Sequence, residues 1–123
     1  HALVLAYTAA NGAVQALTRS VAMEVARDGI GVNCVCPGAI DGSPMLFRFT
    51  GDSDGSASDD DSAVAGAHDE GYRQQAAATY PSGPLPTVAE VADAVLFLLS
   101  PAAGGITGHN LPVDGGFVVN LRR

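Results

Sequence analysis

Two cysteine side chains have a spacing that could support chemistry. Cys34 and Cys36 lie two residues apart in an apolar run with the composition of a β-strand. Because side chains alternate across a strand, both thiols are expected on one face, too close in sequence for a useful disulfide staple. Such thiols can be packed as small apolar groups or used for metal or redox chemistry. We favour the reduced, packed form.

The histidines and the acidic residues give little support for a metal centre. His1, His68 and His109 are far apart in the sequence and contain no pair at helical spacing. The run Asp52-Ser53-Asp54 lacks the glycine at position six and the acid at position twelve of a calcium-binding loop. We therefore expect surface histidines and no metal site.

The charge of the chain is unevenly distributed. The net charge is −7, every positive side chain other than histidine is an arginine, and residues 51–72 contain seven acids without an arginine. No basic stripe is present for nucleic acid, and the acidic run is expected to be a solvated loop. The chain contains no long apolar span and no signal-peptide pattern near His1, so we expect a cytoplasmic protein with no membrane partner.

A long helix is predicted near the start of the chain. From Thr8 onward apolar residues recur at three- and four-residue spacings, which predicts a helix of about 20 residues, opened by Tyr7 and stopped by Asp28-Gly29. The predicted inward face consists of Ala10, Ala13, Val14, Leu17, Val21 and Val25. The early turns are rich in small residues, which suits either packing on the chain's own sheet or a subunit interface.

The apolar run Ile30 to Val35 predicts a strand. Its composition is typical of a strand buried on both faces in a parallel sheet, and Pro37-Gly38 ends it. In open α/β sheets ligands lie just beyond the carboxyl ends of such strands. The segment that follows Pro37 is therefore a candidate binding segment.

A second helix has the clearest start signal. Thr87 and Glu90 form a capping box, and Pro101 prevents the helix from continuing. Its predicted core-facing side consists of Val88, Val91, Ala92, Val95, Leu96 and Leu99. A short strand is predicted from Asn110 to Val113, and residues 68–80 could form one further short helix.

Four blocks in this order resemble the second half of a short-chain dehydrogenase/reductase. They are Tyr7 with its helix, Val32-Asn33-Cys34-Val35-Cys36-Pro37-Gly38, Glu90-Val91-Ala92-Asp93 through Phe97-Leu98-Leu99-Ser100, and Ile106-Thr107-Gly108-His109 through Val113-Asp114-Gly115-Gly116. The resemblance implies an α/β fold: residues 1–123 would be the C-terminal half of a Rossmann-like doubly wound parallel sheet, within a single domain. The glycine-rich turn that holds dinucleotide phosphates in this family does not occur in the sequence. We therefore expect a truncated chain that lacks the N-terminal dinucleotide-binding strands.

The resemblance also implies an activity. Members are NAD- or NADP-dependent oxidoreductases that interconvert a carbonyl and a secondary alcohol, and Tyr7 would take the place of the family's proton donor. A carbonyl that accepts hydride becomes an alkoxide, which a phenol within hydrogen-bond reach can neutralise. The family's lysine, four residues further on, is replaced by Asn11. An amide offers hydrogen bonds but no charge.

By the same resemblance, the segment after the first predicted strand contacts the nicotinamide. The candidate cofactor-binding residues are Pro37, Gly38, Ile40 and Ser43, with Ser43 the nearest hydroxyl to the family's threonine position. Packing would explain these residues equally well.

Residues 46–80 correspond to the family's variable substrate loop. The apolar residues Met45, Leu46, Phe47 and Phe49 suggest a small-molecule substrate with an apolar portion, although packing under the loop explains them nearly as well. The resemblance implies a homo-oligomer, a dimer or a tetramer.

Two other interpretations remain open. The chain could be a catalytically impaired structural or regulatory subunit that assembles with a complete relative. A standalone α/β binding module is disfavoured, because a two-stranded sheet leaves its edges bare.

Overall fold

The computed structural model describes residues 2–41, 74 and 77–119. They form two compact units. The first contains the residues up to Cys36 and Ala92–Pro112, and the second contains the described parts of Pro37–Val91 and Val113–Arg123. The predicted acidic loop lies outside the described residues, and the helix predicted over residues 68–80 lies largely outside them.

Helix α1 spans Ala2–Val25, so it begins earlier than the sequence predicted. Tyr7 lies within this helix rather than at its start, because the preceding alanines and leucines are good helix formers even without a cap. A 3₁₀ turn, Ala26–Asp28, follows, and Gly29 at φ 75° donates its N–H to the Ala26 carbonyl over 3.1 Å. The predicted stop at Gly29 is therefore confirmed.

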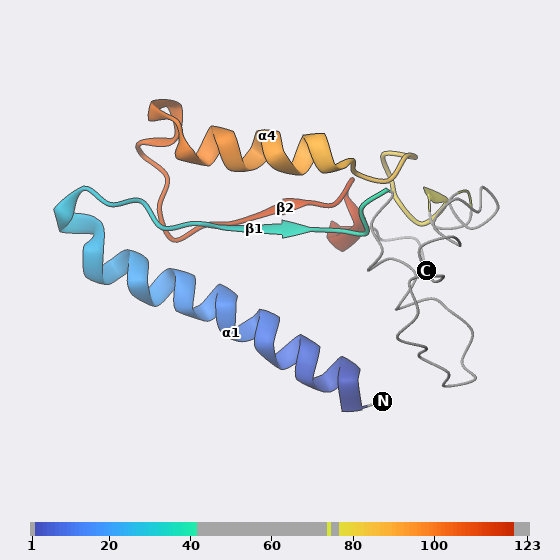
Figure 1. The fold of residues 1–123 in the computed structure, drawn as a ribbon, viewed down its shortest axis with the longest axis horizontal. Helices are drawn as coiled ribbons and strands as arrows, with labels where there is room; N and C mark the ends of the chain where they lie inside the picture. The colour runs from blue at the N-terminus through green and yellow to red at the C-terminus, as the bar shows by residue number, and fades with distance from the viewer. Residues whose placement is uncertain (1, 42–73, 75–76, 120–123) are drawn as a thin grey trace, which may run out of the picture. The chain divides into compact units, whose positions relative to one another are not determined.

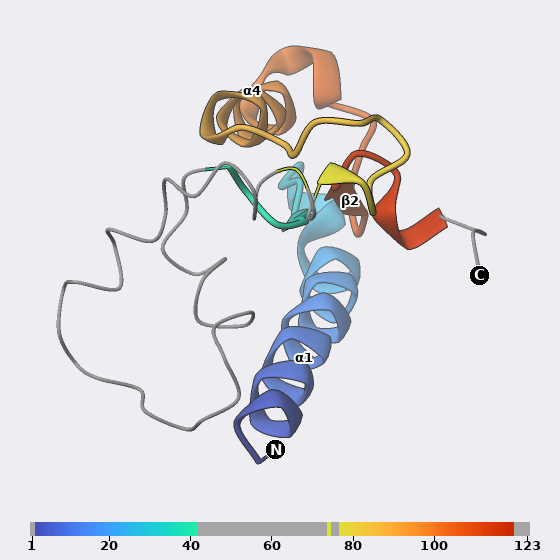
Figure 2. The ribbon, with the colours of Figure 1, turned by 90° about the vertical axis from the view of Figure 1, so that its right-hand side faces the viewer.

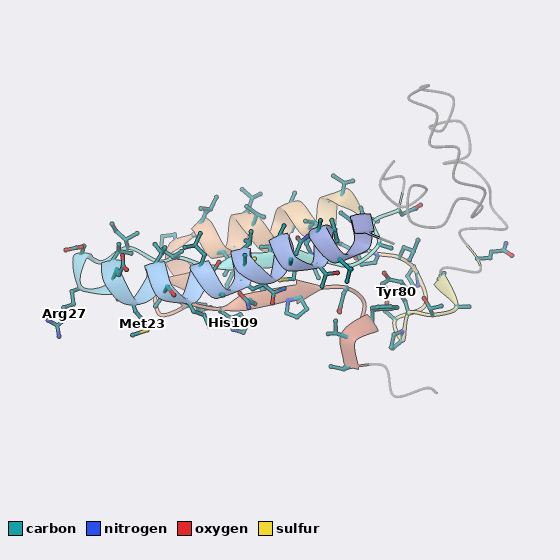
Figure 3. The ribbon with its side chains drawn as sticks, turned by 90° about the horizontal axis from the view of Figure 1, so that it is seen from below. Met23, Arg27, Tyr80 and His109 are labelled. Carbon is teal, nitrogen blue, oxygen red and sulfur yellow. The ribbon has the colours of Figure 1, made fainter. Side chains whose placement is uncertain are left out.

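The inward face of α1 matches the predicted one only at Val21 and Val25, which are half-buried. Thr18 and Ala22 are buried, whereas Leu17 is 60% exposed. Ala22 lies against the turn at Gly108, where an added Cβ would be only 3.5 Å from the Ala22 Cβ. The Thr18 hydroxyl donates to the Val14 carbonyl over 2.9 Å, so its polar group is satisfied. Small side chains thus face inward because the backbones approach closely. Met23, labelled near the end of α1 in Figure 3, is 83% exposed.

Two strands, β1 (Cys34–Pro37) and β2 (Asn110–Val113), form a parallel pair (Figure 1). Cys34 donates its N–H to the His109 carbonyl over 2.9 Å, and Gly38 donates to the Val113 carbonyl over 3.0 Å. The same offset at both points defines a parallel register. The predicted second strand is confirmed at its bounds.

Strand β1 begins later than the predicted Ile30 start, and it is not buried on both faces, because Cys34, Val35 and Cys36 are half-buried and Pro37 is exposed. The Asn33 side chain accounts for the late start. Its Nδ2 donates to the Ile106 carbonyl over 2.9 Å, and its Oδ1 accepts the His109 N–H over 3.1 Å. The Val32 N–H likewise donates to the Thr107 hydroxyl over 3.1 Å. Side chains thus supplement the backbone in this region, where the Gly108 N–H also donates to the Val32 carbonyl over 2.7 Å.

Helix α4 spans Val88–Leu99 and carries the predicted capping box. The Glu90 carboxylate accepts the Thr87 N–H over 2.7 Å, and the Glu90 N–H donates to the Thr87 hydroxyl over 3.2 Å. The predicted core-facing side is wrong in part, because Leu96 is 63% exposed and none of the residues of α4 is fully buried. The half-buried residues of the helix are Val91, Ala94 and Leu98.

Within the first unit, α1 and the part of α4 from Ala92 onward lie on opposite sides of the strands (Figures 1 and 2). Among the described residues, its buried apolar side chains are Ala22 and Ala103, and those of the second unit are Tyr80, Leu85 and Pro86. None of the helices in the described part of the chain is long and apolar enough to cross a membrane.

Candidate active site

Tyr7 lies on α1 with its side chain 44% exposed. Asn11 follows one helical turn later, on the same side of the helix. The Asn11 Nδ2 donates to the backbone carbonyl of Tyr7 over 2.9 Å. The amide is therefore engaged with the helix backbone, and it brings no positive charge to the neighbourhood of the phenol.

The candidate cofactor segment leaves the carboxyl end of β1 and is held at two points. Pro37 is the last residue of the strand, and Ile40 is half-buried. The Ala39 N–H donates to the Tyr80 hydroxyl over 2.6 Å, and the Asp41 N–H donates to the Pro86 carbonyl over 2.9 Å. These two hydrogen bonds fix the path of the chain directly after the strand.

Tyr80 is a positioning residue that the sequence did not reveal. It is buried, and its ring lies 5.2 Å from that of Phe117, centroid to centroid, with an angle of 30° between the planes. Its hydroxyl reaches Ala39 across 41 positions of sequence. No local pattern signals such a long-range contact.

Gly38 is required by close packing. A Cβ at this position would lie 2.9 Å from the Tyr80 hydroxyl oxygen and 3.1 Å from the Asp114 Cα. The space above Gly38 is thus filled by the protein's own residues. The glycine of the Pro37-Gly38 pair is explained by packing, without a ligand.

Asp114 is a buried carboxylate with a structural role. Its Oδ1 accepts the Gly116 N–H and its Oδ2 accepts the Val118 N–H, each over 3.0 Å. The carboxylate therefore orders the turn after β2. The hydrogen bonds of this turn explain the aspartate in the sequence block Val113-Asp114-Gly115-Gly116.

The two cysteines lie on one face of β1, as predicted. Their sulfur atoms are 3.8 Å apart, and both thiols are free and half-buried. Burial raises the pKa of the Cys36 thiol, and the hydrogen bond and the charge of Cys34 raise it further. Both observations favour neutral, packed thiols.

The remaining candidate site residues are placed as follows. Ser43 lies outside the described residues, as do the candidate substrate-loop residues Met45, Leu46, Phe47 and Phe49. Tyr7 and Asn11 belong to the first compact unit, whereas Gly38 and Ile40 belong to the second.

Comparison with known proteins identifies the family. Residues 2–118 match the family described as enoyl-(acyl carrier protein) reductase. The chain is 35% identical, over 92% of its length, to the short-chain dehydrogenase fogB of Aspergillus ruber. It is 37% identical, over 90% of its length, to the inactive 2-(S)-hydroxypropyl-CoM dehydrogenase 2 of Xanthobacter autotrophicus. These alignments cover 35% and 42% of the two relatives, so the chain spans less than half of either.

A solved structure agrees with the sequence relatives. The short-chain dehydrogenase family protein of Francisella tularensis superimposes with a TM-score of 0.72 at 29% identity, over 94% of this chain and 44% of that one. The chain therefore belongs to the short-chain dehydrogenase/reductase family. Members of this family are oxidoreductases.

Proposed function

We propose that residues 1–123 are the C-terminal part of a single short-chain dehydrogenase/reductase domain, one that interconverts a carbonyl and a secondary alcohol with NAD or NADP. The chain would act within a longer or complemented chain that supplies the dinucleotide-binding strands. The observation that carries the proposal is the half-exposed Tyr7 on α1, one turn before Asn11, within a family match that covers residues 2–118.

Tyr7 acts as the proton donor in this proposal. A bound nicotinamide supplies hydride to the substrate carbonyl or takes it from the alcohol. In the reductive direction the Tyr7 hydroxyl gives its proton to the developing alkoxide, and in the oxidative direction the phenolate takes the alcohol proton. Its exposed fraction of 44% leaves the side chain accessible to a substrate.

Asn11 biases the direction of the reaction. An ammonium about 4 Å from the phenol would favour the phenolate by roughly 4 kcal/mol at an effective dielectric constant near 20. Asn11 carries no charge, and its amide donates to the Tyr7 carbonyl. Carbonyl reduction, which starts from the neutral phenol, is therefore expected to suffer less than alcohol oxidation, which needs the phenolate.

The residues after β1 would form part of the cofactor site. Pro37, Gly38 and Ile40 lie at the carboxyl end of a parallel strand, the edge at which α/β sheets bind ligands. The hydrogen bond from the Ala39 N–H to the Tyr80 hydroxyl fixes the position of this segment. A segment held in one position could contact a cofactor. Ser43 would add a hydroxyl to it.

The substrate would be a small molecule with an apolar portion. Residues 46–80 form the substrate loop in this proposal, and Met45, Leu46, Phe47 and Phe49 supply its apolar contacts. Assembly as a homodimer or homotetramer is part of the same proposal, and the cytoplasmic location stays a prediction.

The test is nicotinamide turnover, with a panel of ketones and secondary alcohols, by a longer or complemented chain that contains residues 1–123 and the dinucleotide-binding strands. Tyr7→Phe removes only the hydroxyl, so we expect reduction to fall by about 10²- to 10⁴-fold while the far-ultraviolet circular dichroism stays the same. If Tyr7→Phe turned over ketones as fast as the unsubstituted protein, the assignment of Tyr7 would be wrong.

A second candidate function is a structural or regulatory subunit without turnover. The absence of a lysine at Asn11 favours it, and so does the 37% identical relative that is named inactive. Stable assembly with a complete relative, combined with no turnover in either direction, would support this candidate over the first.

A further inference from the structure

The first part of α1, up to Val14, contains an asparagine followed directly by a glycine, Asn11-Gly12. Asparagine is a thermolabile residue, and it loses ammonia most readily before glycine, whose backbone nitrogen no side chain shields. Space is open around Gly12, since an added Cβ would meet nothing within 4 Å. We propose that Asn11 is a site of spontaneous deamidation, and that local opening of the first part of α1 controls its rate.

The reaction consumes only water. The Gly12 backbone nitrogen bonds to the Asn11 Cγ, the Cγ–Nδ2 bond breaks, and ammonia leaves with the proton of the Gly12 N–H. Water then opens the resulting succinimide ring to aspartate or isoaspartate. The net change replaces the amide NH₂ group by a hydroxyl group, without oxidation or reduction. Because the new carboxyl ionises near neutral pH, the helix gains a negative charge.

The folded helix prevents this attack. In an α-helix each backbone N–H donates to the carbonyl four residues earlier, so the Gly12 N–H is directed at the Thr8 carbonyl. The Asn11 Nδ2 donates to the Tyr7 carbonyl over 2.9 Å, which directs the side chain back along the helix and away from the Gly12 nitrogen. The reaction must therefore proceed from a conformation in which this part of α1 has opened.

Packing contributes little to the stability of the first part of α1. Each of residues 5–14 is exposed, whereas the buried side chains described in this helix, Thr18 and Ala22, lie nearer its end. The first turn contains no acidic side chain, which would stabilise a helix N-terminus. An interior glycine weakens a helix, and isolated helices shorter than about 12–15 residues are marginal in water. The first part of α1 is therefore expected to open while the rest of the chain stays folded.

The test follows deamidation of the 123-residue chain by peptide mass spectrometry, in the native state and in guanidinium chloride at the same pH and temperature. We expect Asn11 to react roughly 10- to 100-fold more slowly in the native protein than in denaturant, the protection of a helix end that opens locally. Asn33 and Asn110 precede Cys34 and Leu111, whose side chains shield the backbone nitrogen. They are internal controls and are expected to react more slowly than Asn11 in both states.

Two alanine-to-glycine substitutions distinguish local opening from unfolding of the whole chain. Ala9→Gly weakens α1 but leaves the Asn11-Gly12 pair unchanged, so we expect the native rate to rise about fivefold and the rate in denaturant to stay the same. Ala92→Gly makes the same change at an exposed position of α4. It is the matched control and is expected to leave both rates unchanged.

Three outcomes would overturn the proposal. A native rate at Asn11 no higher than that at Asn33 would show that the first part of α1 stays closed. Equal rates at Asn11 in the native and the denatured chain would show that the helix gives no protection. Equal acceleration by Ala9→Gly and Ala92→Gly would show that the reaction requires unfolding of the whole chain.

Discussion

Asn11 is the side chain that most changes the chemistry expected of Tyr7. Its amide donates to the Tyr7 carbonyl one turn back along α1, where the family has a lysine. Such a bond between a side chain and the backbone stabilises little and leaves the phenol without a neighbouring positive charge from this position. The direction of any reaction is therefore expected to depend on residue 11.

The first prediction is that Asn11→Lys raises the rate of alcohol oxidation near neutral pH. A lysine supplies the charge that stabilises the phenolate, so we expect a gain of roughly tenfold or more in the oxidative kcat/KM, with the pH–rate profile shifted to lower pH. Asn11→Met, which adds a long uncharged side chain, is the control. An unchanged profile in Asn11→Lys, or an equal gain in Asn11→Met, would contradict the role of charge.

The second prediction concerns the Tyr80 hydroxyl. Tyr80→Phe keeps the ring against Phe117 but leaves the Ala39 N–H without its acceptor, so we expect a loss of about 1–3 kcal/mol in the free energy of unfolding. Urea denaturation measures this loss. Ser20→Ala, which removes an exposed hydroxyl whose hydrogen bond of 3.4 Å to the Ala16 carbonyl stays within α1, is the control. A Tyr80→Phe variant as stable as the unsubstituted protein would show that the segment after β1 is held by other contacts.

At the scale of the elements, substitution of two glycines by alanine is expected to change the stability in opposite directions. A Cβ at Gly38 would crowd Tyr80 and Asp114, whereas a Cβ at Gly12, in α1, meets nothing within 4 Å. We therefore expect Gly38→Ala to destabilise the protein by about 1–3 kcal/mol and Gly12→Ala to stabilise it by about 0.5–1 kcal/mol. Urea denaturation of both variants measures the difference, and a stabilised Gly38→Ala would contradict the close packing after β1.

The capping box of α4 makes the stability of that helix depend on pH. Hydrogen bonds from the Thr87 backbone and side chain lower the pKa of the Glu90 carboxyl. A lowered folded-state pKa means that the stabilisation is complete above the ordinary carboxyl pKa, about 4.3, and is lost as the pH falls through the lower folded value.

Glu90→Gln tests this dependence, because glutamine keeps the acceptor but does not ionise. We expect the unsubstituted protein to exceed the variant in stability at pH 7 and to lose that advantage at pH 3. Denaturant unfolding at the two pH values measures both differences. An advantage that persisted at pH 3 would show that the carboxylate charge is not its source.

At the scale of the whole molecule, few apolar side chains are buried among the residues that the structure describes. None of the large side chains in the described residues is fully buried, and Leu17, Leu96 and Phe97 are among the exposed apolar residues. A two-stranded sheet is marginally stable by itself. The described part of the chain thus presents apolar surface that another segment or subunit could cover.

The last prediction follows from this exposure. We expect the 123-residue chain alone to unfold over a broad temperature range and to bind the dye ANS, because exposed apolar surface and a small core favour both. The short-chain dehydrogenase family protein of Francisella tularensis, of which this chain covers 44%, is the control. A sharp thermal transition without dye binding would contradict the prediction.

The sequence by itself determined the features that depend on neighbouring residues. The capping box at Thr87 and the helix stop at Gly29 are local patterns, because each rests on hydrogen bonds or backbone preferences within a few residues. The strand from Asn110 is predicted from the turn residues Asp114-Gly115-Gly116 that close it, although its hydrogen-bonded partner is distant in the sequence. The four sequence blocks likewise indicated the family that the comparisons confirm.

Only the tertiary structure decided the features that join distant parts of the chain. The Asn33 side chain adds hydrogen bonds to Ile106 and His109 before β1, more than 70 positions away in the sequence. The Tyr80 hydroxyl accepts the Ala39 N–H across 41 positions. The close approach of α1 to Gly108 selects Thr18 and Ala22 as its inward face in place of larger apolar residues. Periodicity records that a helix has an apolar side, but the partner that packs against it determines which residues are buried.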